Sequence, residues 1–168
     1  METLSTVAPD APEDQAASGA LSGVVLRFAG ARYAVDMAAV AEVVPVPPIT
    51  RLPGGPPWLT GVVNWRGRVL PVIDLRPLVG APLSPLPTSA RLVVLSLDDV
   101  ECGVVADMVP GLLECTLAEL EPPPATAAPG IGPLVRAVVD DDGPVALLDA
   151  EAVLALRSEL LTARRGSR

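Results

Sequence analysis

The chain has 168 residues, half of them apolar, and a formal net charge of −8, which disfavours nucleic acid as a partner because phosphate binding requires a positive surface. It contains no histidine, the commonest general base and metal ligand of proteins, so many classes of enzyme are disfavoured as well. No apolar run reaches the ~20 residues of a transmembrane helix, and the N-terminus lacks the pattern of a signal peptide, so we expect a cytoplasmic protein without membrane insertion.

Both ends of the chain have the composition of solvated tails. Residues 1–20 are rich in Ala, Pro, Ser and acidic residues and show no apolar periodicity, which predicts a disordered acidic tail. Residues 163–168 include three arginines and predict a short basic tail. The folded part is therefore expected between about residues 21 and 160.

Between the tails, short β-branched runs alternate with turns of Gly, Pro and Asp. Such runs predict four hairpins, formed by residues 24–28 with 33–35, 59–65 with 68–73, 92–97 with 102–106, and 134–139 with 145–148. This spacing is typical of an antiparallel sandwich or barrel, and the 20 prolines are poorly compatible with long helices. The fold class is therefore mainly β.

Only four aromatic residues are present, so the core must consist mainly of Val, Leu, Ile and Ala. A chain expected in the cytoplasm rarely keeps a disulfide. We therefore expect Cys102 and Cys115 to be small buried side chains with free thiols.

One longer helix is predicted near the C-terminus, at about residues 149–162. Asp149 is a plausible N-cap for it. The apolar stripe of this helix, which suits packing on a sheet, consists of Val153, Leu156, Leu160 and Leu161. A shorter helix is expected from Met37 to Glu42, after an N-cap at Asp36.

A loose internal repeat relates the two halves of the chain. A hairpin turning at Gly67 leads into an apolar strand, Asp74 and a helical stripe, and a hairpin turning at Gly143 leads into a strand, Asp149 and a second stripe. We interpret the halves as two barrel lobes, about residues 21–86 and 87–150, because a barrel leaves no exposed edge. Two unrelated pairs of hairpins are the alternative interpretation.

Residues 61–76 read GVVNWRGRVLPVIDLR, which resembles the G-V-x-N-x-R-G-x-V-x-P-V-x-D-L-R signature of the CheW family of chemotaxis coupling proteins. Residues 26–35, 40–43 and 103–109 are similar to further segments of that family. The resemblance implies two five-stranded, SH3-like barrels that enclose a hydrophobic groove. It also implies a non-catalytic adaptor without cofactor or metal, whose partners are the cytoplasmic tip of a chemoreceptor and the regulatory domain of a CheA-type histidine kinase.

The resemblance also indicates where partners would bind, in a helix-in-groove mode. Val40 would present an apolar side chain to a receptor helix and Glu42 would pair with a cation there, although a buried helix face and a solvated carboxylate are the alternatives. Leu112 would line the opposite wall of the groove. The full set of candidate receptor- or kinase-binding residues is Val40, Glu42, Gly61, Asn64, Trp65, Arg66, Gly67 and Leu112.

The hairpin tip itself gives a physical reason for binding. Gly67 permits a backbone conformation with positive φ, so Arg66 can point outward and offer its five donors to a carboxylate or carbonyl. A solvated surface charge is the alternative for Arg66. Trp65 is either an apolar anchor at the interface or, because strand residues alternate between faces, a side chain inside the barrel.

Two other functions are compatible with the sequence. An adaptor of this kind could serve a chemosensory pathway with a non-flagellar output, such as pili or development. A metal-dependent enzyme could use the cluster Asp140–Asp142, but its spacing does not match an EF-hand loop, and an acidic hairpin tip explains these residues better. As an adaptor, the chain is expected to be recruited to membrane-associated receptor arrays.

Overall fold

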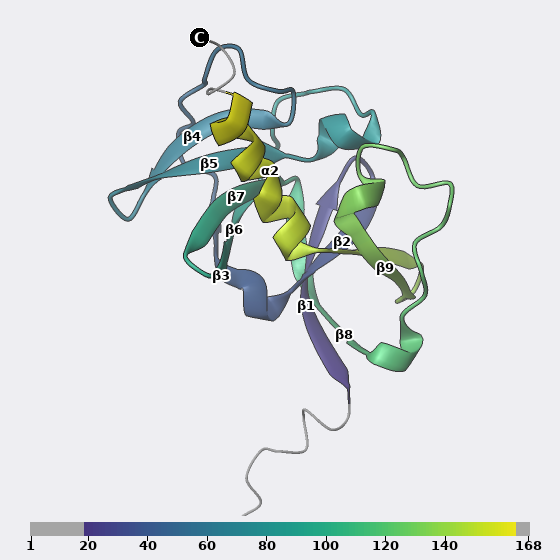
Figure 1. Ribbon diagram of the computed structural model, residues 1–168. Helices are drawn as coiled ribbons and strands as arrows, with labels where there is room; N and C mark the ends of the chain where they lie inside the picture. The colour runs from purple at the N-terminus through teal and green to yellow at the C-terminus, as the bar shows by residue number, and fades with distance from the viewer. Residues whose placement is uncertain (1–18, 164–168) are drawn as a thin grey trace, which may run out of the picture.

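Two five-stranded sheets make up most of the computed structural model, which describes residues 19–163 and side chains up to residue 159 (Figure 1). Sheet A has the strand order β8-β1-β2-β10-β9, and sheet B has the order β3-β6-β7-β5-β4. The strands are β1 (Ala20–Phe28), β2 (Ala31–Asp36), β3 (Val40–Pro45), β4 (Leu59–Trp65), β5 (Arg68–Asp74), β6 (Arg91–Leu97), β7 (Val100–Ala106), β8 (Met108–Thr116), β9 (Val135–Asp140) and β10 (Pro144–Leu148). Most of the predicted acidic and basic tails and the side chains of Leu160 and Leu161 lie outside the described residues.

The mainly β, two-lobe architecture is confirmed, and the four predicted hairpins are β1–β2, β4–β5, β6–β7 and β9–β10. The predicted helix from Met37 to Glu42 is wrong. Asp36 does cap a 3₁₀ helix by accepting a hydrogen bond from the Ala38 N–H at 2.9 Å, but that helix ends at Ala39. The next residues form β3, because Val40, Val43 and Val44 favour extended backbone and Pro45 cannot continue a helix.

The two sheets do not follow the predicted division at about residue 86, because each takes strands from both halves of the chain. Sheet A joins β1 and β2 to β8, β9 and β10, whereas sheet B joins β3, β4 and β5 to β6 and β7. The halves meet in four strand pairs. Pairs β1–β8 and β3–β6 are antiparallel, and pairs β2–β10 and β5–β7 are parallel, with Val145 opposite Arg32 and Val72 opposite Gly103. The two strand orders correspond element by element, so the sequence repeat is present in the fold with strands exchanged between its copies.

The sheets are not the closed barrels that we expected. In each sheet the outer strands form no ladder, and one isolated bridge brings the edges together. In sheet B, Thr50 exchanges two backbone hydrogen bonds with Val62 of β4, at 2.8 and 2.9 Å. In sheet A, Glu121 exchanges two with Val138 of β9, both at 2.8 Å. Each bridge lies in the segment that follows an outer strand, so the sheets curl without closing.

Three apolar clusters occupy the spaces that the sheets define. The interior of sheet A contains Leu21, Val25, Ala34, Leu113, Cys115, Val145 and Leu147. The interior of sheet B contains Val63, Trp65, Leu70, Val72, Leu92, Val94 and Val105. The inter-sheet core contains Leu26, Phe28, Val35, Ile73, Leu75, Val93, Leu95, Cys102, Val104 and Leu148. Successive residues such as Leu92 and Val93 enter different clusters, so the central strands are apolar on both faces.

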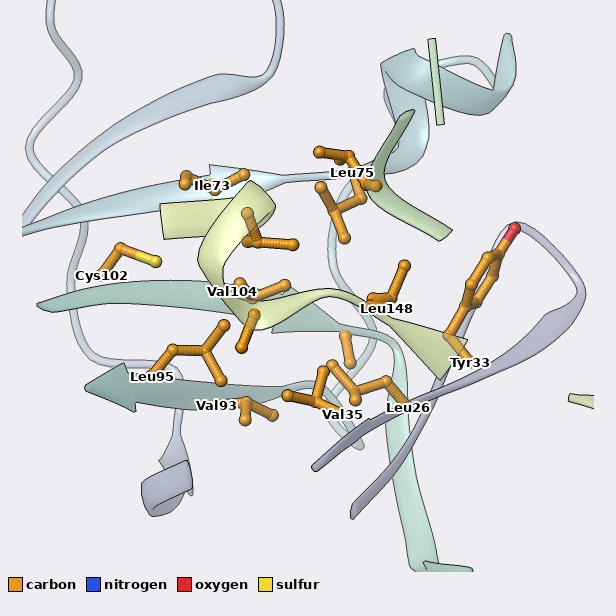
Figure 2. Close-up of a cluster of buried hydrophobic side chains, with 14 of the residues drawn as sticks. Leu26, Tyr33, Val35, Ile73, Leu75, Val93, Leu95, Cys102, Val104 and Leu148 are labelled. Atoms are coloured by element: carbon orange, nitrogen blue, oxygen red, sulfur yellow. The ribbon is translucent and has the colours of Figure 1, made fainter. Parts of the chain in front are cut away.

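Side chains from both sheets converge in the inter-sheet core, where Figure 2 shows Leu26 and Val35 of sheet A facing Val93 of sheet B. This cluster therefore fixes the two sheets relative to each other. Both cysteines are buried and free, as predicted, with Cys102 in the inter-sheet core and Cys115 inside sheet A.

Helix α2 (Ala150–Ala163) covers the inter-sheet core and packs against β6 and β7 (Figure 1). Asp149 is its N-cap, as predicted, because its side chain accepts hydrogen bonds from the N–H groups of Glu151 at 3.0 Å and Ala152 at 3.3 Å. Val153 and Leu154 are buried in the core. Among residues 19–163, no helix is both long and apolar enough to cross a membrane.

Candidate functional site

The tip of the β4–β5 hairpin presents Arg66 to solvent. Arg66 and Gly67 both have positive φ, at 51° and 74°, which is typical of the type I′ turns that suit the twist of a hairpin. The Asn64 side chain fixes this turn by accepting a hydrogen bond from the Gly67 N–H at 3.1 Å. The Arg66 side chain is consequently 67% exposed at the end of a hairpin that projects from sheet B (Figure 1).

Trp65 points into sheet B and not outward as an apolar anchor. It is 9% exposed and packs with the other apolar side chains of the sheet B interior. Two guanidinium groups cover its ring: that of Arg66 lies 4.8 Å from the ring centroid and that of Arg68 lies 5.6 Å from it. Both distances are within the range of cation–π attraction.

Each of these arginines also bonds to a carboxylate on another strand. Arg66 donates to Glu42 of β3 at 2.9 Å, and Arg68 Nη2 donates to Oε1 of Glu101 of β7 at 3.0 Å, with Arg68 Nη1 3.0 Å from the other carboxylate oxygen. Strands β3 and β4 are the two outer strands of sheet B, so the Arg66–Glu42 pair spans the gap between the edges. We call Glu42, Trp65, Arg66, Arg68 and Glu101 the Arg66 cluster.

The cluster changes the expected role of Glu42. Its carboxylate was predicted to be free for a cation on a partner, but it pairs with Arg66 of the same chain. An ion pair this exposed contributes only about 0–1 kcal/mol to stability.

The remaining candidate residues lie in different places. Gly61 is buried in β4, where a Cβ atom would overlap the Thr50 carbonyl oxygen, so this glycine permits the bridge between the edges of sheet B. Val40 is half-buried at the start of β3 and packs against the inter-sheet core. Leu112 is 60% exposed on β8, in sheet A. Of the predicted set, only Glu42, Asn64, Trp65, Arg66 and Gly67 are thus brought together by direct contacts.

Arg68 and Glu101 are members of the cluster that the sequence did not suggest as site residues. Arg68 lies opposite Trp65 across the two-residue turn, so a prediction of the turn type would have placed both side chains on one face. Glu101 carries no such local signal, because its proximity depends on the parallel pairing of β5 with β7.

Hydrogen bonds organise the acidic hairpin tip. Asp140 accepts a hydrogen bond from the Gly143 N–H at 2.9 Å, and Arg32 donates to the carbonyl oxygens of Asp141 and Asp142 at 2.6 and 3.0 Å. Within the described part of the chain, no three Asp, Glu or Cys side chains are arranged to hold a metal ion. Turn chemistry therefore accounts for these residues.

A pocket of about 620 Å³ lies beside β5, with Asp74 and Arg76 in its lining. These two side chains are almost fully buried and bond to each other, with Arg76 Nη2 2.7 Å from Asp74 Oδ2. Arg76 also donates to the carbonyl and hydroxyl oxygens of Ser84, and its bonds to Asp74 raise the pKa of the guanidinium. Asp74 and Arg76 are thus engaged in structural contacts, and Arg51 is a third charged residue of the lining.

Comparison with known proteins agrees with this architecture. Residues 22–158 match the family model of the CheW-like domain, which is most of the chain. The chain belongs to the CheW-like domain family. The membership of the CheW family that residues 61–76 suggested is thereby confirmed.

Individual relatives give the same family. Protein PilI of Pseudomonas aeruginosa is 40% identical over 101 residues, which span 60% of this chain and 57% of PilI. The chemotaxis protein CheW of Bacillus subtilis is 28% identical over 132 residues, or 78% of this chain and 85% of that protein. The crystal structure of the scaffolding protein TtCheW from Thermoanaerobacter tengcongensis is similar with a TM-score of 0.69 and 26% identity, covering 77% of this chain and 88% of that one.

Proposed function

We propose that this chain is a non-catalytic adaptor that couples chemoreceptors to a CheA-type histidine kinase. Its membership of the CheW-like domain family carries this proposal, and its similarity to a solved scaffolding protein supports it. The adaptor acts in the cytoplasm, at membrane-associated receptor arrays. The partners are the cytoplasmic tip of a receptor and the regulatory domain of the kinase.

The proposed binding surface centres on Arg66. One of its five N–H donors bonds to Glu42, which leaves four donors for the acceptor oxygens of a partner. A rigid two-sheet scaffold that exposes such a group on a loop tip is a common arrangement for recognition. Asn64, Gly61 and Gly67 contribute by shaping the hairpin, whereas Val40 and Leu112 are proposed as apolar contacts.

The direct test compares Arg66→Ala with Arg136→Ala. Arg136 is a matched control because it is a partly exposed arginine of sheet A that lies 4.0 Å from Asp36, so the substitution removes the same charge elsewhere. We expect Arg66→Ala to weaken binding to the receptor tip or the kinase domain about tenfold, which is about 1.4 kcal/mol and typical of the minority of interface residues that cost more than about 1 kcal/mol on truncation. Calorimetric titration measures the affinity, and thermal melting checks the fold.

Two outcomes would contradict the proposal. Wild-type protein that binds neither the receptor tip nor the kinase regulatory domain would exclude the adaptor function. If Arg66→Ala unfolds the protein, or if Arg136→Ala weakens binding equally, the Arg66 surface is wrong.

A second candidate is an adaptor of a chemosensory pathway with a non-flagellar output, such as pili or development. The higher identity to PilI than to CheW of B. subtilis favours it, although the PilI match covers a shorter segment. Deletion of the gene in the native host distinguishes the two. Loss of swimming towards attractants indicates the flagellar pathway, whereas normal swimming with altered surface motility or development indicates the second candidate.

A further inference from the structure

The side chain beneath Arg66 is a tryptophan whose surroundings are unusual for a core residue. Trp65 closes one end of the sheet B interior, with apolar neighbours such as Val63 and Leu70 on one side and two guanidinium groups on the other. An aliphatic side chain at this position would fill the same interior. It would lack the electron-rich face that attracts a cation.

The two arginines on the ring are held to different degrees. Both terminal nitrogens of Arg68 lie 3.0 Å from a carboxylate oxygen of Glu101, one of them as a hydrogen-bond donor, and the Glu101 side chain is only 17% exposed, so two contacts orient this guanidinium. Arg66 makes one hydrogen bond, to a single oxygen of Glu42. Arg68 is therefore part of the support, and Arg66 is the group with donors to spare.

A single exposed ion pair does not hold a long flexible side chain in one rotamer, because solvent screens the attraction. The indole ring adds a second, differently directed contact with Arg66. Together the ring and Glu42 restrict the guanidinium before a partner arrives, which reduces the ordering that binding must impose. Arg66 would otherwise sample many rotamers at the tip of its hairpin.

We propose that Trp65 is a positioning residue of the binding surface, which fixes the Arg66 guanidinium so that its free donors meet the acceptor oxygens of a partner. This inference rests on the proposed adaptor function and adds to it a residue that acts through Arg66 without touching the partner. Arg68, held by Glu101, serves the same purpose as a second guanidinium on the Trp65 ring.

A double-mutant cycle with the receptor tip and the kinase regulatory domain as probes tests the inference. Trp65→Leu should weaken binding about fivefold in the wild-type background and less than twofold in the Arg66→Ala background, because its effect passes through Arg66. Trp65→Phe should restore most of the affinity, since the phenyl ring keeps a π face. Equal losses in both backgrounds would overturn the inference.

Trp58→Leu is the control for lost packing. Trp58 is as deeply buried as Trp65 but belongs to the inter-sheet core, so its replacement should lower the melting temperature without a change in the affinity of the folded protein. If Trp58→Leu weakens binding as much as Trp65→Leu does, the effect of Trp65 is general destabilisation and the inference fails.

If Trp65→Leu does not fold, the contact between Trp65 and Arg66 can be tested by NMR on the protein alone, without a binding partner. In Trp58→Phe protein, Trp65 is the one remaining tryptophan of the chain. Its indole N–H resonance should shift when Arg66→Ala is added and stay unchanged with Arg136→Ala. No shift with Arg66→Ala would overturn the inference by itself. Wild-type protein that binds neither probe would overturn the adaptor function as well, whereas additive losses would overturn the role of Trp65 alone.

Discussion

The tips of the β4–β5 and β9–β10 hairpins occupy corresponding places in sheets B and A, but their charges are inverted. Both tips place a non-glycine residue with positive φ before a glycine, Arg66 before Gly67 and Asp142 before Gly143. In both tips, the glycine N–H donates a hydrogen bond to the side chain three residues before it. The acceptor is Asn64 in sheet B and Asp140 in sheet A. The positive φ and the side-chain acceptor are thus shared, whereas the turn length and the exposed groups differ, with two residues between Trp65 and Arg68 and three between Asp140 and Pro144.

The neighbouring strands complement these charges in opposite ways. At the acidic tip, Arg32 of β2 lies against Asp141 and bonds to two backbone carbonyls. At the basic tip, Glu101 of β7 neutralises Arg68 and leaves Arg66 with free donors. The two hairpins of the repeat thus share their place in the fold. Only the β4–β5 tip, through Arg66, leaves hydrogen-bond donors available to a partner.

The ends of β5 and β10 form a second contrast between the sheets, and here we expect the largest change in stability. Asp74, the last residue of β5, is buried and pairs with Arg76, whereas Asp149, which follows β10, caps helix α2. Asp74→Ala should cost about 3–5 kcal/mol of unfolding free energy, because it leaves a buried guanidinium unpaired. Asp149→Ala should cost about 1 kcal/mol. Urea denaturation measures both, and equal costs would contradict the contrast.

The bridges that curl the two sheets should differ in their tolerance of side chains. Gly61 precedes the bridge residue Val62 in sheet B, and Ala137 holds the same place before Val138 in sheet A. Gly61→Ala should cost about 2 kcal/mol, since its Cβ would overlap the Thr50 carbonyl. Ala137→Gly should cost about 1 kcal/mol, because glycine weakens a strand. Thermal melting of both variants is the measurement, and a Gly61→Ala protein as stable as wild type would disprove the close approach.

The smallest expected difference between the sheets is in the reactivity of the two cysteine thiols, Cys102 and Cys115. Burial raises the pKa of Cys102, in the inter-sheet core, from 9.0 to about 12, and it also raises the pKa of Cys115 on the outer strand β8. The folded chain keeps a proton that the unfolded chain releases, so this contribution to stability is complete below pH 9 and is lost as the pH rises towards 12. At pH 8, a thiol reagent should label Cys115 faster than Cys102. Faster labelling of Cys102 would contradict the burial order.

Local signals in the sequence were enough for the hairpins and the caps. Glycines at the turns and Asp149 before the apolar stripe act through neighbouring residues, so their structural effects could be predicted. Strand β8 was missed because Pro110 and Gly111 interrupt it, which an outer strand tolerates. The exchange of strands was missed because it depends on pairing between residues as distant as Arg32 and Val145.

In the candidate site, too, local features could be predicted from the sequence and contacts between distant strands could not. The exposure of Arg66 follows from the turn, and its position was predicted. The partners of Arg66 and Arg68 could not be predicted, because Glu42 and Glu101 reach them only through the curl and strand order of sheet B. Trp65 was left between two interpretations, and packing in the sheet B interior decides for burial.

Strand exchange also determines when the protein can fold during its synthesis. Hairpin β1–β2 has its sheet partners in β8 and β10, so during synthesis its apolar faces stay uncovered until Leu148 has emerged. Such a late completion exposes an intermediate to aggregation and to chaperones. A nascent chain arrested before β10 should therefore keep β1 and β2 open to proteolysis, whereas all five strands of sheet B are already present.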